Sequence, residues 1–202
     1  MNIGIDLDGV LFDTESMYRT FSEVYNTYHF KKKIIDKEEL LAEFRYDWTK
    51  EELNTFIDNC LVYIQENAPA MYLAKEVLFE LKKAGHKLFI VTSRGLLTQK
   101  EIEITNVRLK ELNVEFDGIV FNAKDKFEHC KELNINLMIE DNLRNVQRLS
   151  ENGIKCLYFR DLVVKHCDNK NVTEVRNWGE IYTELVNMKL IEAKDIVPIG
   201  NN

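Results

Sequence analysis

The stretch from Ile3 to Thr14, which reads I-G-I-D-L-D-G-V-L-F-D-T, constrains the fold more than any other part of the chain. It is apolar up to Asp6, a pattern typical of a short strand buried on both faces in the middle of a parallel sheet. Asp6 and Asp8 then come at the carboxyl end of that strand, where open α/β sheets bind their ligands, and Gly9 allows a sharp turn. Two carboxylates so close together repel each other, so the stretch predicts either a bound hard metal ion such as Mg²⁺ or a raised pKa.

The second half of the chain predicts alternating helices and strands. The run K-L-F-I-V-T-S-R-G after His86 predicts a second buried strand, and further strands are expected at 118–122, 137–140 and 155–159. Helices are expected over about 71–85, 98–112, 125–133 and 143–152, and a last one from Trp178 to Lys189. Strands that alternate with helices of this length form right-handed βαβ units, so we expect an α/β fold with a parallel sheet.

The sequence pattern of residues 15–70 predicts helices only. This segment is inserted between the first strand and the rest of the sheet. Apolar residues recur at helical spacing at Met17, Phe21, Val24 and Tyr28. Asp36 with Glu39 has the pattern of a capping box for a helix through Phe44, and Thr49 with Glu52 has the same pattern for a long amphipathic helix that ends before Pro69. We therefore expect an α/β core formed by residues 1–14 and 71–202, and a helical cap formed by residues 15–70.

Polar residues follow four of the predicted strands. Besides Asp6 and Asp8, these are Thr92 and Ser93, Lys124 or Lys126, and Glu140 with Asp141. Because the carboxyl ends of parallel strands lie at one edge of a sheet, these side chains are expected to meet. Acids, a hydroxyl and a lysine form the set that moves a phosphoryl group with the help of a metal ion. Taken singly, each has an ordinary alternative, since such residues also cap helices, form turns or lie on the surface.

The run D-x-D-G-V-L-x-D-T resembles the first motif of the haloacid dehalogenase (HAD) superfamily, most of whose members are Mg²⁺-dependent phosphatases. The superfamily's other motifs are matched in order by Thr92 in I-V-T-S-R, Lys126 in K-F-E-H-C-K-E-L, and Asp141 in I-E-D-N, with Lys124 as the alternative lysine. An EF-hand loop does not fit, because Gly9 comes too early. The resemblance implies a Rossmann-like parallel sheet flanked by helices, with a small all-helical C1 cap inserted after the first strand.

The resemblance also implies roles for the residues at the strand ends. Asp6 is expected to attack phosphorus and form an aspartyl-phosphate, while Asp8 protonates the leaving group and later activates water. Mg²⁺ is expected to be held by the Asp6 carboxylate, the Asp8 backbone carbonyl and the Asp141 carboxylate, with support from Glu140. The phosphate is expected to be bound by Thr92, Ser93 and Lys126. HAD dehalogenases usually lack the second acid, so Asp8 favours phosphate chemistry.

A helical cap together with this first motif looks most like the 5'(3')-deoxyribonucleotidases and their bacterial relatives. The expected substrate is therefore a nucleoside monophosphate, preferably deoxy. Aromatic residues of the cap either pack its helices or stack on a base; they are Tyr18, Phe21, Tyr25, Tyr46 and Trp48. The alternatives are a HAD phosphatase that acts on a sugar phosphate or other small metabolite, and a binding protein that keeps the fold without catalysis.

Composition excludes several other classes of protein. The formal net charge of -7 argues against a nucleic acid polymer as partner. No signal segment and no run of about 18 apolar residues is present, so we expect neither export nor a membrane partner. The four cysteines, Cys60, Cys130, Cys156 and Cys167, lie far apart in the sequence, as expected for reduced thiols in the cytoplasm. The histidines are scattered and predict no metal site, and the sequence leaves the oligomeric state open.

Overall fold

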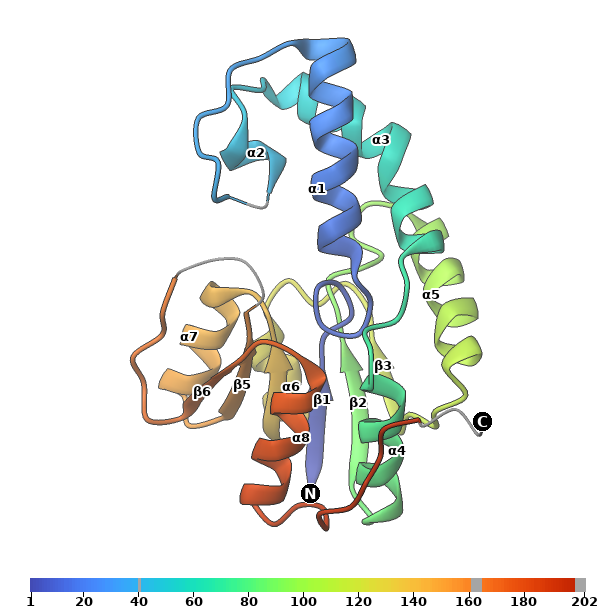
Figure 1. Cartoon of the computed structure of the whole chain (residues 1–202), viewed down its shortest axis with the longest axis vertical. Coiled ribbons are helices and arrows are strands. Elements are labelled where there is room, and N and C mark those ends of the chain that lie inside the picture. Colours follow the sequence, from blue (N-terminus) through green and yellow to red (C-terminus); the bar gives the residue numbers. More distant parts are fainter. Residues whose placement is uncertain (40, 161–164, 199–202) are drawn as a thin grey trace.

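The computed structural model describes residues 1–39, 41–160 and 165–198. Its centre is a six-stranded parallel sheet with the strand order β3-β2-β1-β4-β5-β6 (Figure 1). The strands are β1 (Asn2–Ile5), β2 (Lys87–Val91), β3 (Gly118–Val120), β4 (Ile135–Glu140), β5 (Lys155–Phe159) and β6 (Val172–Val175). The strand order reverses between β1 and β4, so the crevice outside their carboxyl ends is where an open α/β sheet binds ligands. The predicted α/β fold with a Rossmann-like parallel sheet is confirmed.

Helices cover both faces of this sheet. The core helices are α4 (Ala74–Lys83), α5 (Gln99–Leu112), α6 (Lys126–Glu132), α7 (Leu143–Glu151) and α8 (Trp178–Asn187). On one face, α4 and α8 bury their apolar stripes against Ile3 and Ile5, both fully buried in β1. On the other face, α6 and α7 pack against Met138 and Cys156. Burial of β1 from both sides explains its apolar sequence, because a strand of this kind has no solvent face.

The residues between β1 and α4 form a second layer of helices, α1 (Thr14–Tyr25), η1 (Asn26–Phe30), α2 (Ala42–Arg45) and α3 (Lys50–Asn67). Figure 1 shows these helices above the carboxyl ends of the strands. Phe56, fully buried, is at the centre of their own small core. The chain leaves and re-enters the sheet side by side, because Asp13 N donates to Pro69 O at 2.9 Å and Met71 N donates to Leu11 O at 3.0 Å.

Of the two capping boxes predicted within residues 15–70, one is present in the structure and one is not. The Thr49 capping box is confirmed: the Thr49 side chain accepts from Glu52 N, and the Glu52 carboxylate accepts from Thr49 N. The Asp36 capping box is wrong, because no helix begins at Asp36. Its side chain instead accepts from Glu38 N at 2.9 Å, as in an Asx turn. The short helix α2 begins only at Ala42.

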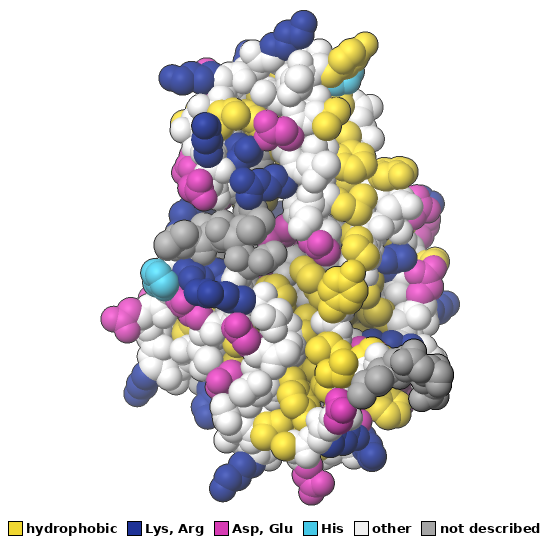
Figure 2. Space-filling model, viewed as in Figure 1, with side chains coloured by type: hydrophobic (Ala, Val, Ile, Leu, Met, Phe, Trp, Pro, Cys, Tyr) yellow, Lys and Arg dark blue, Asp and Glu magenta, His cyan; other side chains and the backbone are white. Residues whose placement is uncertain are grey.

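Two of the four apolar residues predicted to recur along the first helix of this segment are exposed. Val24, in α1, is 65% exposed, and Tyr28, in η1, is 76% exposed. Figure 2 shows hydrophobic side chains running down this view to the right of its centre, whereas lysine and arginine side chains gather at the upper left and are scattered along the other edges. Among the described residues, no helix has both the length and the apolar composition needed to cross a lipid bilayer.

The tail contains a strand that the sequence pattern does not predict. β6 pairs in parallel with β5 from Cys156–Val172 to Phe159–Val175 and forms the edge of the sheet. The helix predicted from Trp178 is present as α8, which ends at Asn187 rather than at Lys189. β3 is also shorter than predicted and ends at Val120.

Candidate active site

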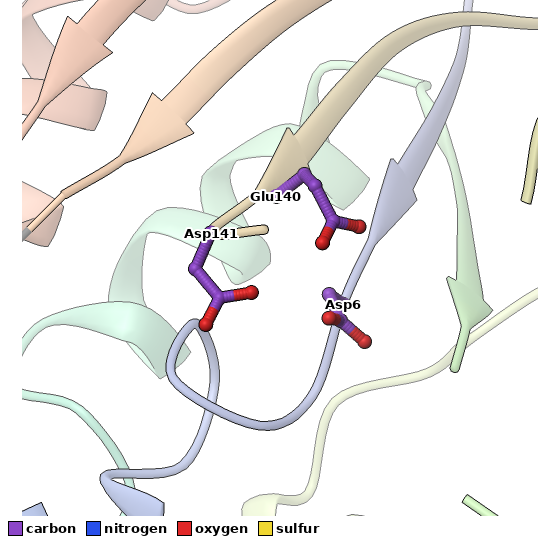
Figure 3. A group of neighbouring side chains, drawn as sticks. All are labelled: Asp6, Glu140 and Asp141. Atoms are coloured by element: carbon purple, nitrogen blue, oxygen red, sulfur yellow. The ribbon is translucent and has the colours of Figure 1, made fainter. Parts of the chain in front are cut away.

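Three carboxylates meet where the strand order reverses. Asp6 directly follows β1, Glu140 ends the neighbouring strand β4, and Asp141 follows it. One carboxylate oxygen from each lies within 4.8 Å of the others (Figure 3). Glu140 is fully buried and Asp6 is only 7% exposed. The convergence predicted from the parallel sheet is therefore present for the first and fourth groups of residues.

The turn between Asp6 and α1 is tightly fixed. Gly9 N donates to the Thr14 hydroxyl at 3.1 Å, and Val10 O accepts a hydrogen bond from the buried Trp178 indole at 2.8 Å. Gly9 has a φ of 72°, and a Cβ there would lie 2.2 Å from Asp141 Oδ2. Glycine is therefore required for the turn to approach Asp141 so closely.

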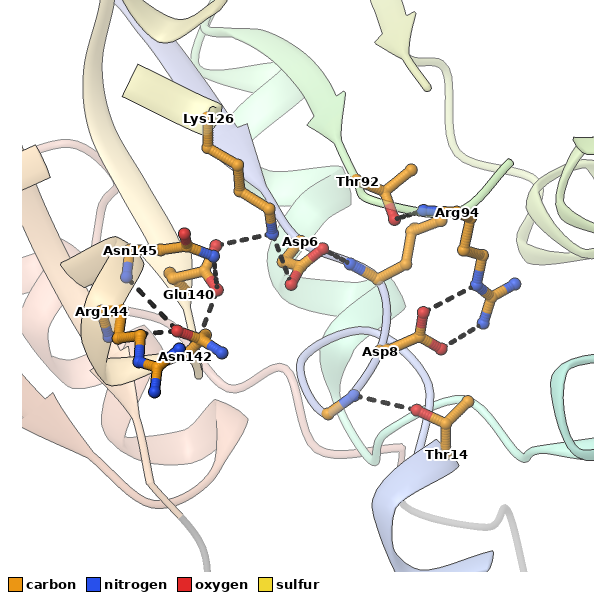
Figure 4. A network of polar contacts seen from close by, with 12 residues as sticks. Asp6, Asp8, Thr14, Thr92, Arg94, Lys126, Glu140, Asn142, Arg144 and Asn145 are labelled. Carbon is orange, nitrogen blue, oxygen red and sulfur yellow. Dashed lines mark hydrogen bonds and ion pairs between the residues drawn. The ribbon is translucent and has the colours of Figure 1, made fainter. Parts of the chain in front are cut away.

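Lys126 lies between two of these carboxylates. Its Nζ is 2.6 Å from Asp6 Oδ2 and 2.8 Å from Glu140 Oε2, and the residue is only 3% exposed (Figure 4). It is the first residue of α6, whose N-cap is Asp125. Lys124, the alternative lysine of the sequence analysis, is exposed. The structure thus brings Lys126, and not Lys124, to the acids.

The Glu140 carboxylate binds Lys126 and two groups of the loop and helix that follow β4. Its Oε1 accepts from Asn142 N at 3.0 Å and from Asn145 Nδ2 at 3.1 Å, while its Oε2 accepts from Lys126. These donors satisfy a buried carboxylate that would otherwise be costly. Glu140 therefore fixes Lys126 and the loop after β4, while its support of a Mg²⁺ site stays a prediction.

Burial, together with the neighbouring carboxylates, raises the pKa of the acids in this cluster. Burial raises the pKa of Asp6 to about 7, with Glu140 acting in the same direction and Lys126 opposing it. Burial and the nearby carboxylates of Glu15, Glu140 and Asp6 raise the pKa of Asp141 well above its usual value. Although burial acts against it, the pKa of Lys126 is raised by Asp6 and Glu140. One lysine does not balance these acids, and a set of hard oxygen donors around Asp6 and Asp141 fits a divalent cation such as Mg²⁺.

Asp8 is turned away from this cluster toward an arginine that the sequence analysis missed. Arg94 Nε and Nη2 donate to the two Asp8 carboxylate oxygens at 2.9 and 2.6 Å, and Arg94 Nη1 donates to Thr105 Oγ1 at 3.0 Å. Although burial acts in the opposite direction, Arg94 lowers the pKa of Asp8. The guanidinium is 1% exposed and the Asp8 side chain 36% exposed, so Asp8 faces a cavity while Arg94 supports it from behind. Only the position of Arg94 just after Thr92 and Ser93, at the same sheet edge as Asp8, hinted at this pair.

The hydroxyl residues after β2 take different positions. Thr92 is fully buried, and its Oγ1 accepts a hydrogen bond from Arg94 N at 3.2 Å. Ser93 is exposed and lines the cavity beside Asp8. Of the two predicted phosphate-binding hydroxyls, Ser93 is therefore the one that reaches open space in this structure.

A cavity of about 710 Å³ lies between the strand ends and the helices above them. Its wall includes Asp6, Asp8, Ser93, Lys126 and Asp141 from the sheet side. The aromatic residues that line it are Tyr18, Phe44 and Tyr158. Trp48 instead belongs to the small core of the helical layer: its indole donates to Asn26 Oδ1 at 2.8 Å and stacks on Tyr46. Trp48 and Tyr46 therefore pack the helical layer. Of the five aromatic residues predicted either to pack the cap or to stack on a base, only Tyr18 lines the cavity.

No protein-family model and no curated protein matches the sequence. Solved structures match it over most of its length. A haloacid dehalogenase-like family hydrolase from Streptococcus pneumoniae has a TM-score of 0.64 at 16% identity, covering 93% of this chain and 97% of that one. A putative beta-phosphoglucomutase from Thermotoga maritima has a TM-score of 0.57 at 21% identity, covering 92% and 98%. CbbY from Rhodobacter sphaeroides, solved with xylulose-(1,5)bisphosphate, has a TM-score of 0.55 at 16% identity, covering 85% and 92%. The fold is therefore that of the HAD hydrolases.

Proposed function

We propose that the protein is a Mg²⁺-dependent phosphomonoester hydrolase of the HAD superfamily that acts through Asp6. The observation that carries this proposal is the buried Asp6–Lys126 pair, with an Nζ–Oδ2 distance of 2.6 Å, at the sheet's ligand-binding crevice. A carboxylate and an ammonium group open to one cavity can attack a phosphoryl group and balance its charge. The shared fold of HAD hydrolases supports the same chemistry.

In the proposed reaction, Asp6 is the nucleophile and Asp8 transfers the protons. An Asp6 carboxylate oxygen forms a bond to phosphorus while the phosphorus–ester oxygen bond breaks, and the leaving oxygen takes a proton from Asp8. Asp8 then accepts a proton from water, whose oxygen bonds to phosphorus and releases inorganic phosphate from Asp6. Lys126 stabilises the phosphoryl oxygens, and Ser93 donates to one of them. Held by the Asp6 and Asp141 carboxylates and the Asp8 carbonyl, Mg²⁺ would supply further positive charge at the phosphoryl group.

Asp8 must leave Arg94 before it can reach a leaving group. In this structure both of its oxygens are occupied by the Arg94 guanidinium. Arg94 is also held by Thr105, because its Nη1 donates to Thr105 Oγ1. We therefore infer that the structure describes a resting arrangement, and that substrate binding beneath residues 15–70, acting as a cap, accompanies a turn of the Asp8 side chain.

For the substrate, we propose a nucleoside monophosphate, cleaved as by a 5'-nucleotidase. The flat rings of Tyr18, Phe44 and Tyr158 in the cavity wall support this choice, because a base can stack on such rings. A sugar phosphate is the second candidate, and it is favoured by the likeness to a putative beta-phosphoglucomutase and to CbbY. Both candidates are small, so the proposed partner is a free metabolite rather than a nucleic acid polymer.

We also propose that the enzyme works in the cytoplasm. Among the described residues all four cysteines are free thiols, and Cys60, Cys130 and Cys156 are buried. Unpaired thiols are typical of proteins in a reducing compartment.

A phosphatase screen tests the proposal. Purified protein is assayed with p-nitrophenyl phosphate, nucleoside monophosphates and sugar phosphates, with Mg²⁺ and with EDTA. The Asp6→Asn variant keeps the shape of the side chain but removes the nucleophile, so turnover should fall by several orders of magnitude. Asp58→Asn, an exposed change on α3, is the control. Normal turnover by Asp6→Asn, or activity that survives EDTA unchanged, would contradict the mechanism. Phosphate release from no substrate would favour a binding protein without catalysis.

A further inference from the structure

Gln65 carries a buried hydrogen-bond acceptor without a partner at the edge of the cavity. It lies on α3, is 3% exposed and forms part of the cavity wall. Its Nε2 donates to Glu101 Oε1 at 2.9 Å. A carboxylate oxygen accepts hydrogen bonds, so this contact fixes the orientation of the amide and leaves Oε1 facing away from Glu101. Among the described residues, Gln65 Oε1 has no hydrogen-bond partner.

Glu101 holds the amide rigidly against the loop that follows β2. It is 3% exposed, and its Oε2 accepts hydrogen bonds from the backbone N–H groups of Gly95, Leu97 and Thr98 at 3.0 to 3.1 Å. The same loop begins with Ser93, which lines the cavity. The unpaired acceptor is thus fixed at the junction between the helical layer and the phosphate end of the cavity.

The wall that residues 15–70 contribute to the cavity consists of acceptors and apolar groups. Its charged members are Glu15, Asp36, Glu39 and Glu43, while Arg144 and Lys165 line the cavity from outside this segment, and Lys165 Nζ lies 2.8 Å from Glu39 Oε2. Carboxylate oxygens accept hydrogen bonds from hydroxyl and amino groups. The unpaired amide oxygen of Gln65 has the same preference, because a buried acceptor is stabilised when a donor reaches it.

We propose that Gln65 is a specificity-determining residue whose Oε1 accepts a hydrogen bond from a hydroxyl or amino group of the leaving alcohol. The substrate class is then a phosphomonoester whose leaving alcohol carries such donors. This inference rests on the proposed phosphatase function and narrows its substrate.

Two variants separate recognition from structural support. Gln65→Met removes both polar groups, whereas Gln65→Lys keeps a donor toward Glu101 but has no acceptor. Each protein is assayed with matched substrate pairs: glycerol 3-phosphate with propyl phosphate, and phosphoethanolamine with ethyl phosphate. The readout is the ratio of kcat/KM within each pair, because this ratio cancels changes that both members share.

The wild-type protein should favour the donor-bearing member of at least one pair by about tenfold in kcat/KM, as expected for one hydrogen bond. Both variants should bring the ratio for that pair close to one. If Gln65→Lys keeps the wild-type ratio, Gln65 only tethers α3 to Glu101, and the proposal is wrong. A wild-type protein without this preference also overturns it. Failure to hydrolyse even p-nitrophenyl phosphate with Mg²⁺ would instead refute the proposed function.

Discussion

Replacing Lys126 with methionine should destabilise the folded protein strongly. Methionine keeps much of the length of the side chain but removes the ammonium group, whose Nζ is 2.6 Å from Asp6 and 2.8 Å from Glu140. The side chains of Asp6 and Glu140 are only 10% and 0% exposed. The variant therefore leaves two buried carboxylates without the cation between them, and water cannot replace it.

The expected loss follows from this burial. Removing one partner of a buried ion pair costs about 3 to 5 kcal/mol in the free energy of unfolding, because the remaining charge is left uncompensated. The loss should also depend on pH. Burial already raises the pKa of Asp6 to about 7, and removal of Lys126 takes away the group that opposes this rise. A carboxyl with a higher pKa in the folded state lowers stability as pH increases, so the loss should be larger at pH 8 than at pH 6.

Urea unfolding in EDTA measures this loss in the absence of divalent cations. Lys124→Met is the matched control, because Lys124 is exposed and two residues away in the chain, and its change should lie within about 0.5 kcal/mol of zero. Repeating the measurement with Mg²⁺ should reduce the deficit of Lys126→Met, since a bound cation neutralises the same acids.

Several results would refute this reasoning. A loss below about 1 kcal/mol for Lys126→Met would show that the carboxylates do not need the lysine, against the cost expected for an unpaired buried charge. Equal losses for Lys126→Met and Lys124→Met would assign no special role to the buried lysine. A larger loss at pH 6 than at pH 8 would mean that ionisation of Asp6 is not what destabilises the variant.

Two further predictions concern Asp8. The Asp8→Asn variant should lose roughly 10²- to 10⁴-fold in turnover with poor leaving groups and less with p-nitrophenyl phosphate, and an equal loss for all leaving groups would speak against proton transfer by Asp8. A double-mutant cycle of Asp8→Asn with Arg94→Met, measured by urea unfolding, should give a coupling energy of about 1 to 3 kcal/mol, because the two side chains share two hydrogen bonds of 2.6 and 2.9 Å. Additive losses would show that the pair contributes nothing beyond the two residues separately.

The core of the fold follows from the sequence because its signals are local. Strands such as β1 are buried on both faces, so they read as short apolar runs, and the helices between them carry clear ends such as the Thr49 capping box. The parallel arrangement then brings the strand ends to one edge, which is why Asp6, Asp141 and one of the two lysines, Lys124 or Lys126, could be grouped without a structure.

The features that the sequence did not predict depend mostly on contacts between residues far apart in the chain. β6 lies at the sheet edge and has two polar residues between Val172 and Val175, so its pairing with β5 gives it a strand conformation that its sequence alone does not demand. Arg94 pairs with Asp8 across 86 residues of sequence, and nothing local distinguishes it from a surface arginine. Asp36 has the letters of a capping box, but its side chain satisfies a nearer backbone N–H and no helix begins there.

The two connections between the sheet and the helical layer hydrogen-bond to each other, at Asp13 with Pro69 and at Leu11 with Met71. The ends of the inserted segment therefore meet regardless of what lies between them, and lengthening it adds only a small entropic cost of loop closure. During evolution, such a segment can be replaced by one of a different size without disturbing β1 or the turn after it. In the enzyme that we propose, recognition of the organic group and the chemistry at Asp6 can consequently diverge separately, because the first would be encoded mainly between these connections and the second outside them.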